Sequence, residues 1–192
     1  MNAVFKNEIE KIQNEEYRDF IKYYLDECTP KYFYSIGASS SGKFHPKFSQ
    51  GEGGLVRHTQ AVVMFAETLL ELSSYRYLND EYKDYVYMAC ILHDTVKYGF
   101  NDEMTAEDYA EHAENAAFNV NKAWVQFFNN SAPELLLMAI KSHMGQWSTC
   151  KDDRPFTTLD RVVHLADYMA SRKFIDIPTL SAEGGEKEEE NA

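Results

Sequence analysis

The sequence predicts an all-α protein that folds as a single-domain helical bundle, and three observations lead to this prediction. Apolar residues recur every three or four positions along most of the chain, which is the spacing of one helix face. No stretch alternates apolar and polar residues as a half-buried strand does, and only residues 32–36 form a short β-prone segment. The chain has 192 residues, 44% of them hydrophobic, which is enough to bury one core.

Residues 1–28 are expected to form an amphipathic helix that packs on the core. The helix should end before Thr29-Pro30, because a proline disfavours helical backbone in the residue that precedes it. Residues 29–54 are rich in glycine, serine, lysine and histidine and predict a long loop of the kind that is functional or mobile. The apolar positions that follow helical spacing in the first segment are Phe5, Ile9, Ile12, Phe20 and Tyr24.

Residues 55–176 are predicted to form the main helical domain, which begins with two helices. Asn79 or Asp80 is expected to cap the second of them, which runs to Leu92. The first helix carries an apolar stripe that starts with a histidine, so this histidine should face inward. The stripe consists of His58, Val62, Phe65, Leu69 and Leu72.

Three further helices are predicted in the second half of the domain. Residues 105–108 resemble a capping box with aspartate in place of glutamate, and they should open a helix that runs to about Phe128. Pro133 suits the first turn of a helix over 134–143, and Thr157 or Thr158 starts the last helix. Residues 181–192 are acidic and lack apolar anchors, so we expect a disordered tail.

An adjacent imidazole and carboxylate, His93-Asp94, stands where the second helix of this domain should reach the surface. His58 and Asp167 lie on two other predicted helices and add a second nitrogen and a second oxygen donor. Any one of these histidines is more often a hydrogen-bonded core residue than a ligand. For the whole set a shared divalent metal ion is favoured, because a buried charge is costly unless it is paired or metal-bound.

The order His, His-Asp, Asp, with Leu-His-Asp-x-x-Lys at 92–97, resembles the HD-domain superfamily of metal-dependent phosphohydrolases over residues 50–173. Within that superfamily, Gly-Gly-Leu-x-x-His-Thr at 53–59 and Ser-His-Met-Gly-Gln-Trp at 142–147 are similar to the HD domain of bacterial 3'-to-5' exoribonucleases. Those enzymes carry an additional nucleic-acid-binding domain that is not visible in this chain. The resemblance therefore implies phosphoester chemistry in an HD-type helical bundle more than it implies an RNA substrate.

The HD subfamilies that carry two more histidines imply a second metal ion beside the first, with Asp94 bridging the two. His112 and His143 occupy the matching part of this chain, although His112 could equally face solvent beside acidic neighbours. His164, three residues before Asp167, is expected to support the ligands from behind, with a ligand or core role as the alternatives. The predicted ligands are His58, His93, Asp94, His112, His143 and Asp167.

Mixed nitrogen and oxygen donors fit manganese, iron or zinc better than calcium. The sequence predicts one or two divalent ions, which can be manganese, iron, zinc or magnesium, and it does not choose among them. Lys97 and Asp94 are the predicted catalytic residues. The ammonium of Lys97 is expected to neutralise charge on the phosphoryl group, and either Asp94 or Asp167 is expected to orient the attacking water. The alternative for Lys97 is a helix C-terminal lysine favoured by the helix dipole.

Substrate contacts are predicted at Lys43, His45, Arg57 and Gln146. Residues 37–43 match Gly-x4-Gly-Lys, but we reject a nucleotide-binding P-loop because Phe44 replaces the required hydroxyl residue. A loop that closes over the metal site and holds a substrate phosphate is the remaining functional interpretation, and a surface loop is the plain alternative. Trp147 is predicted to fill the core, with stacking on a base as the alternative.

The composition limits the class of substrate and partner. The net charge of −12 disfavours binding of long duplex nucleic acid, because an acidic surface repels a phosphate backbone. Three cysteines without a Cys-x-x-Cys pair, no signal-peptide pattern and no apolar run of membrane-spanning length predict a cytoplasmic protein without a membrane partner. The sequence leaves the oligomeric state open.

The leading functional hypothesis is a metal-dependent phosphohydrolase acting on a nucleotide or a short oligonucleotide. A 3'-to-5' nuclease on single-stranded RNA or DNA would use the same site but needs a basic, aromatic groove. A non-catalytic metal- or nucleotide-binding regulatory module is the alternative from another class. Retention of every predicted ligand together with Lys97 argues against such a module.

Overall fold

The computed structural model describes residues 2–39, 45–102, 109–148 and 153–180. Over these ranges the ordered secondary structure is helical, with seven α-helices, several short 3-10 helices and no strand. The prediction of an all-α fold is therefore confirmed. The capping box predicted at 105–108, the tail predicted at 181–192 and Lys43 lie outside the described residues.

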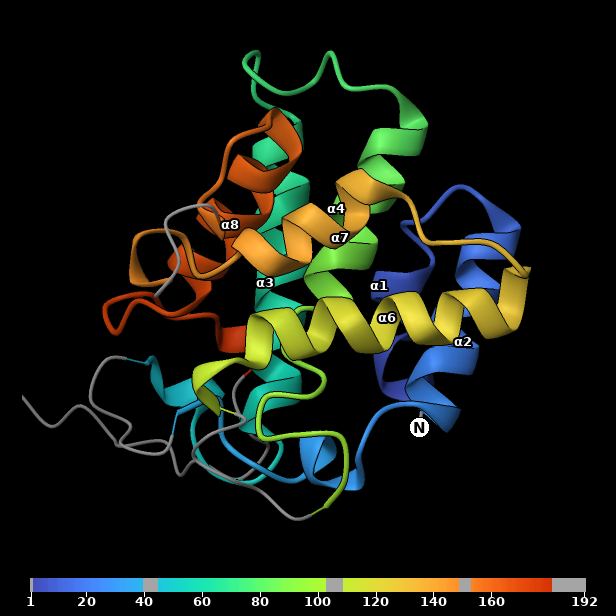
Figure 1. The fold of residues 1–192 in the computed structure, drawn as a ribbon. Helices are drawn as coiled ribbons and strands as arrows, with labels where there is room; N and C mark the ends of the chain where they lie inside the picture. Colours follow the sequence, from blue (N-terminus) through green and yellow to red (C-terminus); the bar gives the residue numbers. More distant parts are fainter. Residues whose placement is uncertain (1, 40–44, 103–108, 149–152, 181–192) are drawn as a thin grey trace, which may run out of the picture.

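Four α-helices form the central bundle around the main core (Figure 1). The long helix α3 packs mainly against α8 and α4, and α7 contacts both α4 and α8. Buried faces of all four helices are apolar, as the periodicity predicts. Their bounds are α3 (Gly54–Leu70), α4 (Asp80–Leu92), α7 (Glu134–Ser142) and α8 (Thr158–Ala170).

Helix α6 (His112–Phe128) lies across this bundle and joins it to the N-terminal helices, with α7 on one side and α2 (Glu15–Glu27) on the other (Figure 1). The contact with α2 is aromatic. The ring of Phe20 on α2 lies 4.8 Å from that of Trp124 and 5.8 Å from that of Phe128, both of which are on α6. Aromatic pairs at such separations add to the burial of their apolar surface, so α2 is held firmly on the bundle.

The N-terminal segment does not form the one continuous helix that its periodicity predicts. It consists of η1 (Asn2–Phe5), α1 (Lys6–Ile9) and, after a break, α2. The side chain of Asn14 caps α2, and the carboxylate of Asp84 accepts hydrogen bonds from the backbone N–H groups of Gln13 and Asn14. A distant carboxylate therefore stabilises the break, while the apolar spacing survives because both pieces pack on the same core.

The predicted helix starts and stops in the bundle agree well with the structure. Asn79 caps α4 through a hydrogen bond from the backbone N–H of Tyr82, and α4 ends at Leu92. Thr157 caps α8 in a capping box with Asp160. The β-prone segment at 32–36 is different, because it lies largely in a 3-10 helix, η2 (Lys31–Tyr34). The remaining 3-10 helices are η3 (Lys47–Ser49), η4 (Gly145–Trp147) and η6 (Pro178–Leu180).

The loop before α3 passes so close to the helix start that only glycine fits there. A Cβ atom on Gly54 would lie 2.3 Å from the carbonyl oxygen of Ser49 and 3.0 Å from the Cα atom of Gly37. The two neighbouring segments are themselves paired, because the backbone N–H of Ala38 donates to the Ser49 carbonyl. This packing fixes the first turn of α3, which carries His58 one turn further on.

Within the described ranges, no helix has the combination of length and hydropathy that a bilayer crossing requires.

Candidate metal centre

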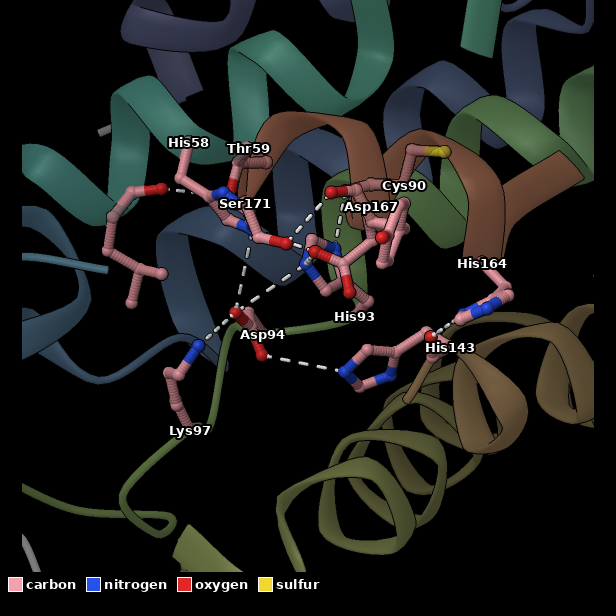
Figure 2. Close-up of polar contacts among 12 residues, drawn as sticks. His58, Thr59, Cys90, His93, Asp94, Lys97, His143, His164, Asp167 and Ser171 are labelled. Atoms are coloured by element: carbon pink, nitrogen blue, oxygen red, sulfur yellow. Dashed lines mark hydrogen bonds and ion pairs between the residues drawn. The ribbon is translucent and has the colours of Figure 1, made fainter. Parts of the chain in front are cut away.

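The six predicted ligands come from five helices or helix ends and converge in the middle of the bundle (Figure 2). His58 lies on α3, His93 and Asp94 follow α4, His112 opens α6, His143 follows α7 and Asp167 lies on α8. All are buried except Asp167, which is partly exposed. Among the described residues, their donor atoms form two clusters in which all atoms lie within 4.8 Å of one another: His58, His93 and Asp167, and Asp94, His112 and His143.

The first cluster is arranged around the carboxylate of Asp167. Its Oδ1 atom lies 3.0 Å from Nε2 of His58 and 3.8 Å from Nε2 of His93. Atoms that share one metal ion at about 2.1 Å are separated by roughly 3 to 4 Å, so these separations suit a common ion. In the second cluster, Oδ1 of Asp94 lies 3.4 Å from Nε2 of His112 and 3.8 Å from Nε2 of His143.

Asp94 connects the two clusters through its two oxygen atoms. While Oδ1 faces His112 and His143, Oδ2 lies 3.5 Å from Nε2 of His93 and 4.0 Å from Nε2 of His58. Figure 2 shows this carboxylate between Lys97 and the imidazoles. A carboxylate placed in this way can bridge two ions.

The backbone orients three of the imidazoles. In His93, His112 and His143 the Nδ1 atom lies 2.7 to 2.8 Å from the carbonyl oxygen three residues earlier. Because a carbonyl only accepts hydrogen bonds, Nδ1 carries the proton and Nε2 presents its lone pair to the cluster. The same arrangement positions many histidine ligands of metal ions.

Two observations show that these donors fit a cation. The Nε2 atoms of His112 and His143 are only 3.1 Å apart, and with both protons on Nδ1 two lone pairs face each other. Among the described residues, Nε2 of His93 and Oδ1 of Asp94 are buried without a hydrogen-bond partner. Buried lone pairs without donors are costly, and an ion between them removes the cost.

Electrostatics keep the donors in the protonation states that bind metal. Burial, together with neighbouring His93 and His112, lowers the pKa of His143 to about 3, and burial also lowers the pKa of His112. Burial alone would raise the pKa of Asp94, but Lys97 and the imidazoles outweigh it and hold this pKa well below its usual range. At neutral pH the second cluster therefore offers two neutral imidazoles and one carboxylate.

Lys97 is buried and its ammonium lies 2.6 Å from Oδ2 of Asp94. Burial would lower the pKa of Lys97, but the charge of Asp94 and the hydrogen bond to it raise the pKa, so the side chain stays cationic. Since α4 ends at Leu92, Lys97 is not on its last turn, and the alternative of a helix-capping lysine is not supported.

The turn that carries Asp94 and Lys97 is held by side chains of the N-terminal segment. The hydroxyl of Tyr24 lies 3.2 Å from that of Thr95. The hydroxyl of Tyr32 donates to the carbonyl of Gly99 and accepts from the N–H of Tyr98. The segment before the helical domain therefore helps to position the site.

His164 supports the second cluster from behind. Its Nδ1 atom donates to the carbonyl oxygen of His143 at 2.7 Å (Figure 2). Gly145, two residues after His143, has no room for a side chain, because a Cβ atom there would lie 2.1 Å from the His164 ring. Its φ of +57° also favours glycine. The supporting position expected for His164 matches this geometry, and Gly145 is a constraint that the sequence alone does not reveal.

The clusters open into a cavity of about 140 Å³. His45 lines it, with its ring centroid 5.7 Å from that of His58, and burial together with His58 lowers the pKa of His45 to about 4. Trp147 also lines the cavity and is 47% exposed, so the expectation that it fills the core is wrong. Five further residues line the cavity without a signal in the sequence that singles them out, although Ser171 follows Asp167 by one helix turn. They are Tyr109, Met144, Tyr168, Ser171 and Arg172.

Two predicted substrate contacts, Arg57 and Gln146, are not among the described residues that line this cavity. The guanidinium of Arg57 donates to the carbonyls of Phe48 and Gln50 and so holds the loop before α3. Gln146 is exposed on η4. Lys43 lies outside the described residues, so its predicted role remains a prediction.

The helical bundle thus brings two histidine–aspartate clusters and a buried lysine to one cavity, an arrangement suited to binding divalent metal ions. The HD domain family model matches residues 55–172, which is more than half of the chain, and the chain belongs to the HD domain family. This match identifies an HD-domain phosphohydrolase and gives no support for the exoribonuclease subgroup. Neither a curated protein nor a solved structure matches the chain significantly.

Proposed function

We propose that the protein hydrolyses a phosphate ester or anhydride of a nucleotide or short oligonucleotide with the help of two divalent ions. The observation that carries this proposal is the placement of Asp94, which directs one oxygen to each histidine cluster. Histidine-rich clusters suit manganese, iron or zinc better than magnesium, which prefers oxygen ligands. The proposed ligands are the six residues of the two clusters, His58, His93, Asp94, His112, His143 and Asp167.

Divalent ions bound by these six residues would supply an activated water molecule and positive charge beside the phosphoryl group. Lys97 adds a fixed positive charge beside Asp94, and because its pKa is raised it acts as a cation rather than as a base. Asp94 remains ionised and keeps Lys97 directed at the cavity. His45 lies at the edge of the cavity and offers a neutral imidazole for a hydrogen bond to the substrate.

The size of the cavity and the net charge of the protein favour a small substrate. A cavity of about 140 Å³ is smaller than the roughly 300 to 1,000 Å³ of pockets that enclose drug-sized ligands, so it suits a phosphoryl group and its immediate neighbours. The net charge of −12 disfavours tracking along a long polyanion. A mononucleotide or a short oligomer satisfies both constraints.

Trimming of single-stranded RNA or DNA from the 3' end is the second candidate. Its support is the exposed indole of Trp147 at the cavity, since aromatic side chains stack on unpaired bases. The resemblance at 53–59 and 142–147 points in the same direction. The acidic composition argues for short rather than long strands.

A substrate panel tests the proposal. Full-length protein would be assayed with manganese, iron(II), zinc or magnesium against nucleoside mono-, di- and triphosphates, cyclic nucleotides and single-stranded oligomers of increasing length. We expect metal-dependent hydrolysis of at least one nucleotide or short oligomer, with Asp94→Asn as the inactive control. Hydrolysis of p-nitrophenyl phosphate without hydrolysis of any nucleotide or oligomer would reject the proposed substrate class. Stepwise release of mononucleotides from oligomers alone would select the nuclease.

A further inference from the structure

Three planar groups from two parts of the chain form one wall of the cavity. The rings of Trp147 on η4 and Tyr168 on α8 are stacked, with centroids 5.5 Å apart and planes inclined by 12°. The guanidinium carbon of Arg172 lies 4.3 Å from the Tyr168 centroid and 5.5 Å from the Trp147 centroid. These three residues, which we call the aromatic wall, line the same cavity as the carboxylates of Asp94 and Asp167.

The indole of Trp147 is not explained by packing. It is 47% exposed, whereas Trp124 in the α2–α6 contact is 4% exposed and its indole N–H donates to Asn130. Trp147 also lines a neighbouring cavity of about 200 Å³, so it stands between two hollows of the surface. A large exposed aromatic side chain at a reaction site is a common binding surface for a planar ligand.

Arg172 brings a positive charge that no carboxylate among the described residues balances. Among the described residues it makes no ion pair, and its buried Nε atom has no hydrogen-bond partner. Its Nη2 group donates to the hydroxyl of Ser171, and stacking on Tyr168 fixes its plane. Lys97 is already paired with Asp94, so Arg172 is the cation of the described cavity lining that is open to an anion.

We propose that the aromatic wall is the nucleotide-recognition subsite of the enzyme, in which a nucleobase stacks on Trp147 and a phosphate oxygen of the same nucleotide binds Arg172. This inference rests on the proposed function, because it assumes that the substrate carries a base. Tyr168 acts as a positioning residue that holds Trp147 and Arg172 in place. Stacking accepts every base, so the subsite provides selection for nucleotides over base-free phosphates rather than for one base.

Stopped-flow tryptophan fluorescence tests base stacking before turnover begins. Full-length protein would be mixed with each of the four ribonucleoside 5'-monophosphates, and with ribose 5-phosphate as the base-free probe. We expect saturable quenching by at least one nucleotide, none by ribose 5-phosphate, and loss of the quenching in Trp147→Ala. Quenching that persists in Trp147→Ala, or its absence for every nucleotide, would overturn the proposal.

Steady-state kinetics separate the two contacts. Trp147→Ala should raise KM for a nucleotide by about tenfold or more relative to KM for ribose 5-phosphate, which is the order expected for one stack. Arg172→Ala should raise KM for both substrates and leave the bound metal unchanged. Phe156→Ala and Arg161→Ala are matched controls, because both side chains are exposed and lie outside the described cavity linings.

The two proposals fail in different ways. If nucleotides are hydrolysed but Trp147→Ala and Phe156→Ala have equal KM values, the aromatic wall is not the subsite and the proposed function stands. If only base-free phosphates are hydrolysed and no nucleotide quenches the fluorescence, both the nucleotide substrate and the subsite are rejected. Neither result tests whether hydrolysis depends on metal, which the substrate panel with and without metal measures.

Discussion

Two buried aspartates near helix α4 show how the same side chain serves stability in one place and chemistry in another. Asp84 and Asp94 are each 2% exposed. The oxygens of Asp84 accept hydrogen bonds from the backbone N–H groups of Gln13 and Asn14 at 2.7 and 2.9 Å. Within the described structure, Oδ1 of Asp94 has no hydrogen-bond donor and faces the Nε2 atoms of two histidines. Burial alone therefore does not indicate function, whereas a buried carboxylate oxygen that lacks a donor and faces the Nε2 atoms of buried histidines does.

The difference lies in whether the protein itself supplies hydrogen-bond donors to the carboxylate. Asp84 completes the hydrogen bonding of a helix start, so nothing else has to bind there. Asp94 belongs to a set of lone pairs that repel one another until a cation is present. Substitutions at the carboxylates and at Lys97 test this distinction.

Asp94→Asn should lower turnover by about 10³-fold or more, because the loss of metal-borne charge stabilisation amounts to several kcal/mol. Bound metal should fall, as measured by elemental analysis, while the helical circular dichroism persists. Asp84→Asn is the matched control, with the same chemical change at the same burial, and it should keep both metal and turnover. Equal loss of metal in the two variants would remove the distinction drawn between them.

Lys97→Ala should keep the metal and lower kcat by about 10²-fold, the usual effect of removing one preorganised charge from a transition state. Steady-state kinetics measures kcat, and elemental analysis of the same sample measures the metal content, which should not change. An unchanged kcat would assign Lys97 to charge balance with Asp94 alone.

Asp84→Asn should reduce the free energy of unfolding by about 1 to 3 kcal/mol, because one of the two part-buried hydrogen bonds from Gln13 and Asn14 loses its acceptor oxygen. Urea unfolding of metal-free protein measures this change, with Asp94→Asn for comparison. A reduction below a few tenths of a kcal/mol would show that the break before α2 does not depend on Asp84.

Glu8 provides a partly buried carboxylate for the comparison, and its substitution should have the smallest effect. Its Oε2 atom is buried without a partner among the described residues, and burial raises its pKa above the ordinary value of 4.5. The folded state therefore gains stability from Glu8 below pH 4.5 and loses this contribution as the pH rises through the folded-state pKa. Glu8→Gln should stabilise the protein at neutral pH by less than about 1 kcal/mol, since the side chain is partly solvated. Between pH 4 and pH 7, the melting temperature of Glu8→Gln should depend less on pH than that of the wild type. A melting temperature of Glu8→Gln below that of the wild type at neutral pH would contradict this account.

The sequence predicts those parts of the fold that depend on local signals. The helix caps at Asn79 and Thr157 and the inward face of α3 follow from the sequence because capping and periodicity are local properties. Leu72 of the predicted stripe is the exception, since it lies beyond the end of α3 and is exposed. The break at Asn14 was missed because it depends on Asp84, which lies 70 positions away. The 3-10 helix at Lys31–Tyr34 was missed because its aromatic residues pack against distant segments rather than into a sheet.

The same division holds for the site. The six residues of the two clusters were predicted from the order of histidine and aspartate residues along the chain, and the structure brings their donor atoms together. The place of Trp147 could not be predicted, because it depends on Tyr168 and Arg172, which a separate helix brings beside it. Packing partners that are far apart in sequence leave no periodic signal.

Metal stoichiometry combined with anomalous diffraction tests the central claim most directly. Full-length protein purified without chelators and supplied with manganese, iron(II) or zinc would be analysed for bound metal and then crystallised. The account predicts two ions per chain, one in the cluster of His58, His93 and Asp167 and one in that of Asp94, His112 and His143. Protein that binds none of these metals in stoichiometric amount, or anomalous peaks that lie away from both clusters, would contradict it.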